Sequence, residues 1–103
     1  MVYEMRVYTL QPGKVPEFQA LIEKEALPII NKYSKLVGWW STEIGPLNEV
    51  VHIWAYEDLA HRTRARQAQA EDSQLQAFRP KAQAMIVSQY NKIMTPANFS
   101  PLK

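Results

Sequence analysis

The chain has 103 residues, of which 47% are hydrophobic and 11% aromatic, and its formal net charge is +2. This length suits one domain, residues 1–103, and the composition is that of a folded protein. The small charge gives no reason to expect a nucleic-acid partner. Because cysteine is absent, disulfides, thiolate nucleophiles and cysteine-ligated metals are excluded.

The N-terminal residues lack the basic and apolar segments of a secretory signal. No apolar run approaches the roughly 20 residues that a membrane span needs. We therefore expect a cytoplasmic protein with no membrane span, and the lack of cysteine fits a reducing compartment.

The first predicted element is a strand over residues 2–10, which are rich in β-branched and aromatic side chains. Residues 11–14 end it, because they contain Pro-Gly. From Val15 to about Tyr33, apolar residues mostly recur at a spacing of three to four, which predicts an amphipathic helix. Pro28 is expected to kink or restart this helix.

Two further strands are predicted at residues 36–44 and 49–56, on either side of the turn sequence Gly-Pro-Leu-Asn. If Ile44 pairs with Glu49, the two strands form a hairpin with a defined register. This register places three pairs of residues opposite each other on one face: Trp39 with Trp54, Ser41 with His52, and Glu43 with Val50.

Asp58 is a suitable N-cap for a second helix that runs to about Ala70. A further turn or short helix is expected to begin at Asp72 or Ser73 and to end near Pro80 or beyond. Residues 85–94 predict a last strand, and a tail follows it.

The predicted order is βαββαβ, which folds as a ferredoxin-like α+β domain: a four-stranded antiparallel sheet with two helices on one face. We expect the face away from the helices to be strongly aromatic. It would carry Tyr8, Trp39, His52, Trp54 and Tyr56. So much aromatic surface is unfavourable in water, and two facing sheets in a homodimer would bury it.

Several segments resemble the NIPSNAP family, most clearly residues 42–48 (Thr-Glu-Ile-Gly-Pro-Leu-Asn) leading into Val-His-Ile-Trp at 51–54. Residues 4–10, 12–15, 38–40, 88–89 and 99–101 are also similar to it. The resemblance implies a dimeric α+β barrel. The same architecture serves cofactor-independent monooxygenases, muconolactone isomerase-like proteins and haem-dependent chlorite dismutases, which is an analogy of fold alone.

His52 is the candidate general base, because its pKa lies near neutrality and it is predicted in mid-strand on the aromatic face. The alternative is a histidine that is hydrogen-bonded in an interface. Ser41 is a candidate hydrogen-bond partner, but the spacing specifies no acid for a triad, and no nucleophile-elbow motif occurs.

Charged residues are also predicted in this region. Glu4, Arg6 and Tyr8 alternate on the first strand, and Glu43 could share their face. They could orient a polar substrate together with the two tryptophans, Trp39 and Trp54. Alternatively, Arg6 forms an ion pair with Glu4 or Glu43, because a buried charge must be paired.

Arg62 and Arg66 are four residues apart on the second helix and therefore share a face. They could hold a carboxylate or phosphate at the barrel mouth, or they could form a solvated helix surface. No spacing of His52 and His61 suits zinc or iron, and we expect no metal. Isolated glycines exclude nucleotide-binding loops, and a lone histidine is weak support for haem. No cofactor is predicted.

Three functional hypotheses follow. The first is a homodimer that binds a small, partly apolar ligand or a protein partner. The second is a cofactor-independent monooxygenase or isomerase in which His52 is the base and Arg6 or Tyr8 orients a substrate oxygen. The third is an adaptor that acts through its outer helices, with Arg62 and Arg66 as its informative residues. The enzyme hypothesis needs a cavity beside His52.

Overall fold

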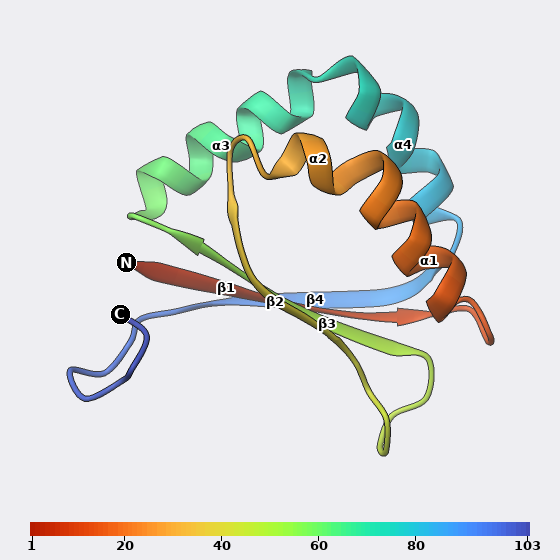
Figure 1. The fold of residues 1–103 in the computed structure, drawn as a ribbon, viewed down its shortest axis with the longest axis horizontal. Helices are drawn as coiled ribbons and strands as arrows, with labels where there is room; N and C mark the ends of the chain where they lie inside the picture. The colour runs from red at the N-terminus through yellow and green to blue at the C-terminus, as the bar shows by residue number, and fades with distance from the viewer.

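The computed structural model describes residues 1–103 as one sheet with helices on one of its faces (Figure 1). The strands are β1 (Val2–Leu10), β2 (Lys35–Ser41), β3 (Glu49–Tyr56) and β4 (Ile86–Met94). The helical segments are α1 (Val15–Leu21), η1 (Ile22–Ala26), α2 (Leu27–Ile30), α3 (Leu59–Glu71) and α4 (Ser73–Gln83). The four strands pair antiparallel in the order β2-β3-β1-β4. The predicted ferredoxin-like order is confirmed.

The first helix is interrupted near Pro28, as the sequence predicts. Proline has no N–H to donate to the carbonyl of Lys24. The chain responds with the π-helical turn η1, in which the N–H of Leu27 bonds to the carbonyl of Ile22, five residues earlier. Helix α2 continues directly, and Ile29 is buried in the core. The interruption therefore changes the pitch of the helix without ending it.

The second crossover contains two helices, in agreement with the predicted helix to about Ala70 and the further turn or short helix predicted from Asp72 or Ser73. Asp58 begins α3 by accepting a hydrogen bond from the His61 N–H at 2.7 Å. Asp72 has an extended backbone (φ −74°, ψ 123°), so it ends α3, and its carboxylate then caps α4 by accepting from the N–H groups of Gln74 and Leu75. The result is a bend between α3 and α4 over the sheet (Figure 1).

The predicted orientation of the aromatic residues is wrong. His52, Trp54 and Tyr56 are only 3–6% exposed because they lie on the face that the helices cover. Trp39 is half-buried and packs against the main core, which contains Phe18 and Leu75. The opposite, open face is apolar as well, with Met5, Val7, Tyr90, Val51, Ile53 and Trp40 paired across it. Alternation of residues cannot decide which of two apolar faces the helices cover.

The predicted hairpin register is also wrong, because β2 ends at Ser41 and the turn is longer than four residues. The observed pairs are Trp39 with His52 and Ser41 with Val50. Thr42 closes the turn by bonding to Glu49, through Oγ1 to Oε1 at 2.6 Å and through its N–H to the carbonyl at 3.0 Å. The pairing differs by two residues from the prediction, so Trp39 and His52 keep a common face. Glu43 instead lies exposed in the turn.

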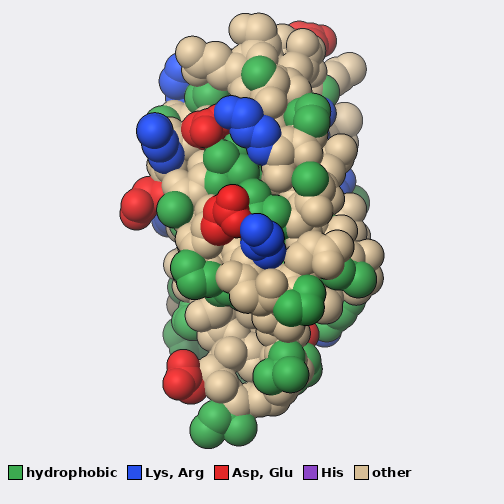
Figure 2. All heavy atoms as spheres, turned by 90° about the vertical axis from the view of Figure 1, so that its right-hand side faces the viewer, with side chains coloured by type: hydrophobic (Ala, Val, Ile, Leu, Met, Phe, Trp, Pro, Cys, Tyr) green, Lys and Arg blue, Asp and Glu red, His purple; other side chains and the backbone are tan.

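The end of the molecule where α1 and α4 lie carries charges of both signs. Figure 2 shows basic and acidic side chains next to one another there. Ion pairs of 3.0 Å join Lys14 to Glu17 and Lys81 to Glu25. None of the helices is both long and apolar enough to cross a lipid bilayer.

Candidate functional site

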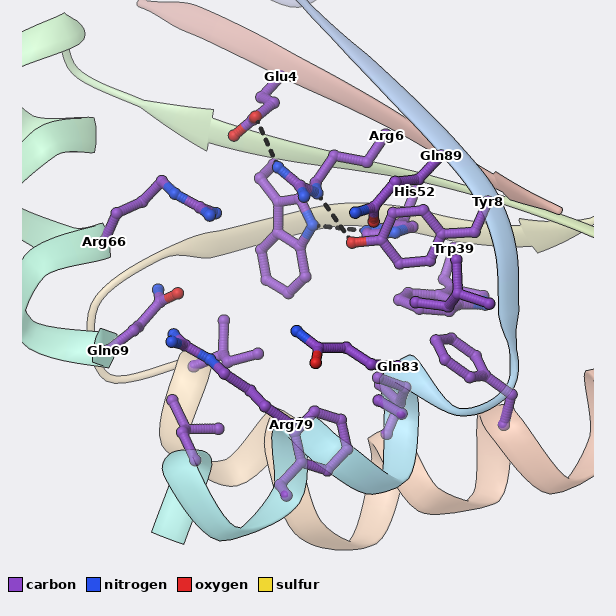
Figure 3. Close-up of a pocket in the computed structure, with 18 of the residues that line it drawn as sticks. Glu4, Arg6, Tyr8, Trp39, His52, Arg66, Gln69, Arg79, Gln83 and Gln89 are labelled. Atoms are coloured by element: carbon purple, nitrogen blue, oxygen red, sulfur yellow. Dashed lines mark hydrogen bonds and ion pairs between the residues drawn. The ribbon is translucent and has the colours of Figure 1, made fainter. Parts of the chain in front are cut away.

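A cavity of about 300 Å³ lies between the helix-covered face of the sheet and the helices. Its walls are formed by residues from all four strands and from the helices above them, and Figure 3 shows labelled side chains from both sides directed into it. Its lining comprises Glu4, Arg6, Tyr8, Phe18, Ile22, Ile30, Trp39, His52, Trp54, Tyr56, Arg66, Gln69, Leu75, Phe78, Arg79, Ala82, Gln83, Ile86 and Gln89. The sheet side is mainly aromatic and the helix side is mixed.

Aromatic rings in contact form the inner wall around His52. The imidazole stacks on Trp39, with centroids 4.1 Å apart and an interplanar angle of 17°. Tyr8 meets it edge to face at 4.9 Å, and Phe18 packs beside both Tyr8 and Trp39. Such aromatic contacts fix ring orientation as well as burying apolar area. The imidazole therefore has little freedom to turn.

His52 is held neutral, with a defined proton position. Burial, together with the positive charge of Arg6, lowers the pKa of His52 to about 3. Its Nδ1 accepts a hydrogen bond from Nε1 of Trp54 at 2.7 Å. A neutral imidazole that accepts at Nδ1 carries its proton on Nε2, so the remaining nitrogen is a donor. This geometry does not favour the predicted role of His52 as a general base.

Two hydrogen-bond donors in this wall have no partner. Nε2 of His52 and Nε1 of Trp39 are buried, and neither makes a hydrogen bond within the chain. An unpaired buried donor costs about 1–3 kcal/mol. Unpaired groups of this kind concentrate where a ligand or an ordered water completes the structure. Both donors belong to residues that line the cavity, but the atoms themselves are closed off, so an acceptor in the cavity would pair with them only after neighbouring side chains move.

Glu4 is a buried carboxylate surrounded by donors. It is 1% exposed and accepts from Arg6 Nη1 at 2.9 Å, from Arg62 Nε and Nη2 at 3.0 and 2.9 Å, and from Asn91 Nδ2 at 2.6 Å. Burial alone would raise its pKa, but the hydrogen bonds of Arg62 and Asn91 and the charge of Arg6 lower it to about 2. Arg6 also donates from Nε to the Tyr8 hydroxyl at 2.9 Å. Glu4 thus joins β1, β4 and α3.

The helix side of the cavity carries arginine and glutamine side chains. Figure 3 shows Arg66 on α3 and Arg79 on α4 extending toward the same space, with Gln83 between Arg79 and the sheet. Gln69 is buried, and its amide donates to Ser34 Oγ at 2.9 Å. Arg66 and Arg79 belong to none of the ion pairs in the chain. Their charge is available to a ligand.

Most of the predicted site residues meet at this cavity. Glu4, Arg6, Tyr8, Trp39, His52, Trp54 and Arg66 line it. The interpretation of Arg6 as the ion-pair partner of Glu4 agrees with the structure, and Arg62 joins the same network without lining the cavity. The predicted placement of Ser41 and Glu43 on this wall is wrong. Both are exposed outside it, because β2 ends at Ser41.

Residues on α4 and β4 complete the cavity and were not predicted. Arg79 and Gln83 follow the buried residues Phe78 and Ala82 by one position each, so they flank the inward stripe of α4. Recognising Leu75, Phe78 and Ala82 as that stripe would have located them. Gln89 comes from β4. The structure has no group of three or more His, Asp or Glu side chains that could hold a metal ion.

Comparison with known proteins gives one family. The NIPSNAP family profile matches residues 3–101. The human Protein NipSnap homolog 3A is 47% identical over 75 residues, which are 72% of this chain and 30% of that protein. The chain thus spans about a third of the length of this relative.

Solved structures agree with this result. An uncharacterized NIPSNAP domain protein from Burkholderia xenovorans is 42% identical and superposes with a TM-score of 0.94, covering 98% of this chain and 99% of that one. SnoaB, a cofactor-independent oxygenase from Streptomyces nogalater, shares the fold at a TM-score of 0.69 with 16% identity, over 97% and 96% of the two chains. By profile, sequence and fold, the chain belongs to the NIPSNAP family.

Proposed function

We propose that this protein binds a small, partly apolar molecule in the cavity between sheet and helices, and that it does so as a homodimer. The observation that carries the binding proposal is a partly apolar cavity whose lining residues include two unpartnered donors, His52 Nε2 and Trp39 Nε1. A ligand oxygen that reached them, after a movement of the side chains that close them off, would recover the free energy that their burial costs.

The size and lining of the cavity limit the ligand. A volume of about 300 Å³ is at the small end of the range for ligand sites. Eleven of the 19 lining residues are hydrophobic, so most of the ligand surface would be apolar. The other eight lining residues are polar or charged, and polar groups at defined positions are what orients a small molecule in such a site.

The homodimer proposal rests on the open face of the sheet. Trp40 and Tyr90 on this face are 52% and 60% exposed, and they adjoin Val51 and Val7. Contiguous apolar surface of this kind marks an interaction site. A second copy related by a two-fold axis would bury the same face of both chains at once. Each cavity would remain on the far side of its own sheet.

The oxygenase or isomerase alternative takes a different form from the one that the sequence suggested. His52 would donate from Nε2 to a substrate oxygen that becomes negatively charged, and Arg6 or Tyr8 would orient that oxygen. The donor geometry of His52 and its contact with Tyr8 support this version.

The adaptor alternative relied on Arg62 and Arg66. Because Arg62 forms an ion pair with Glu4, only Arg66 of these two arginines is free to contact a partner.

The binding proposal can be tested with N-phenyl-1-naphthylamine, an uncharged apolar dye whose fluorescence rises on binding. Ala82 is 6% exposed and lines the cavity. Ala82→Leu fills part of that space, and we expect it to weaken dye binding about tenfold, since an overfilled site excludes the dye. Ala77→Leu, at an exposed position on the same helix, is the matched control.

Circular dichroism should show that both variants remain folded. Equal binding by wild type and Ala82→Leu would mean that the dye occupies another surface, such as the open face. That result, or no binding by the wild type, would contradict the proposal.

A further inference from the structure

We propose that the ligand of this cavity is a small organic anion, an apolar body with one acidic group, and that Arg66 and Arg79 bind the acidic group. This inference rests on the proposed binding function and narrows it to a chemical class. Arg66 and Arg79 come from α3 and α4, on either side of the bend at Asp72, and Figure 3 shows both side chains directed into the cavity.

The charges of the lining are unbalanced. Three arginines and one glutamate line the cavity, a net charge of +2. The single carboxylate, Glu4, already accepts from Arg6, Arg62 and Asn91. No carboxylate that lines the cavity is therefore left for Arg66 or Arg79. A guanidinium fork matches a carboxylate or phosphate oxygen pair, so an anion from outside the chain is the fitting partner.

Two lysines on the outer side of the helices differ from these arginines in being paired. At the end formed by α1 and α4, Lys14 and Lys81 are paired with Glu17 and Glu25 (Figure 2). Partial burial and repulsion by Arg6 lower the pKa of Arg66. A bound anion would relieve that repulsion.

The arrangement also gives the ligand a direction. Arg66, Arg79 and Gln83 lie on the helix side, and the rings of Trp39 and His52 on the sheet lie across the cavity from them. The acidic group would therefore face α3 and α4, and the apolar body would contact the rings. A second oxygen on that body could accept from His52 Nε2 or Trp39 Nε1 once neighbouring side chains move.

The test compares two dyes that differ in one sulfonate. These are 8-anilinonaphthalene-1-sulfonate, which is an anion, and the uncharged N-phenyl-1-naphthylamine. We expect Arg66→Gln/Arg79→Gln to weaken binding of the anionic dye by ten- to a hundredfold at low salt and to change binding of the neutral dye less than twofold. Arg64→Gln is the matched control, because Arg64 is exposed on α3 and does not line the cavity.

The outcomes separate this inference from the function on which it rests. If the double variant weakens both dyes equally, or neither, the arginines do not select an anion and the inference is wrong. An equal loss on Arg64→Gln would mean attraction by overall charge, which also overturns it. If the neutral dye fails to bind the wild type, or binds Ala82→Leu equally well, the binding proposal itself fails.

Discussion

The two faces of the sheet are both rich in apolar residues, but they differ in how their polar groups are used. On the helix-covered face, Glu4 and His52 are almost completely buried, and each has a defined hydrogen-bond partner. On the open face, Trp40 and Tyr90 remain exposed. On the covered face each buried polar group fixes which of its atoms are hydrogen-bonded within the chain and which remain unpaired, so a ligand would be held in one orientation. The open face instead presents exposed apolar surface, which suits association with a second copy.

The largest effect should come from breaking the polar network of the covered face. Glu4→Gln removes the negative charge that Arg6 and Arg62 share, and leaves the partly buried Arg6 beside a neutral group. We expect the free energy of unfolding to fall by about 3–5 kcal/mol in urea titrations, because a buried charge would lose its partner.

Glu43→Gln is the control for this change, since Glu43 is exposed in the turn and has no ion pair. Its effect should stay within about 0.5 kcal/mol. Similar values for the two variants would show that the Glu4 network adds little to stability.

A charge on the open face should break the proposed dimer and leave the monomer folded. Ile53→Glu places a carboxylate beside Met5 at the centre of that face. We expect the dimer dissociation constant to rise at least a hundredfold, about 2.7 kcal/mol. Sedimentation velocity over a range of concentrations measures it.

Leu59→Glu provides a comparison, because Leu59 is 57% exposed at the start of α3. It should leave association unchanged. A wild-type protein that stays monomeric at high concentration would refute the dimer proposal outright.

Acid should destabilise the covered face through His52. Its pKa is about 3 in the folded chain and 6.5 in the reference state. Below pH 6.5 the unfolded chain therefore takes up a proton that the folded chain refuses, and stability falls as the pH falls toward 3. The slope approaches 1.4 kcal/mol per pH unit, so the loss at pH 5 is about 2 kcal/mol.

Urea titrations at pH 7 and pH 5 measure this difference. His52→Gln should abolish most of it, and His61→Gln should not. Glu4, with a pKa lowered to about 2 from 4.5, adds a loss in the same direction only at lower pH. A pH dependence that survives His52→Gln would place its origin elsewhere.

The smallest effect on the folded monomer should come from Gly38→Ala. A Cβ at this position would lie 2.4 Å from the far end of the Trp40 ring, so the ring must move. Because Trp40 is half exposed, monomer stability should change by less than about 1 kcal/mol. The dimer should weaken several-fold, as measured by sedimentation, if Trp40 belongs to its interface. An unchanged dimer would place Trp40 outside that interface.

The sequence predicted features that depend on near neighbours. The strand at residues 2–10, the interruption at Pro28 and the cap at Asp58 each follow from a few adjacent residues, and the structure confirms them. Features that depend on contacts between distant segments were predicted less well from the sequence. Which face the helices cover was predicted wrongly, because both faces are apolar, and the hairpin register failed because the turn is longer than its Gly-Pro sequence suggests.

The candidate site shows the same division. The three β1 residues that line the cavity were predicted, because alternation places Glu4, Arg6 and Tyr8 on one side of a strand. His52 and Trp54 on β3 were also predicted. Arg79 was not, because only a turn or short helix was expected there and the inward stripe of Leu75, Phe78 and Ala82 was not recognised. The bond from Asn91 to Glu4 joins residues 87 positions apart, and no local pattern indicates it.

The central place of β1 has a consequence for how the protein is made. This strand is synthesised before the other three strands of the sheet, and its neighbours, β3 and β4, follow much later. The carboxylate of Glu4 meets Arg62 after 58 further residues and Asn91 after 87. The cavity therefore closes only after β4 has been synthesised, and a nascent chain that stalls before Ile86 exposes an unpaired strand edge to its surroundings.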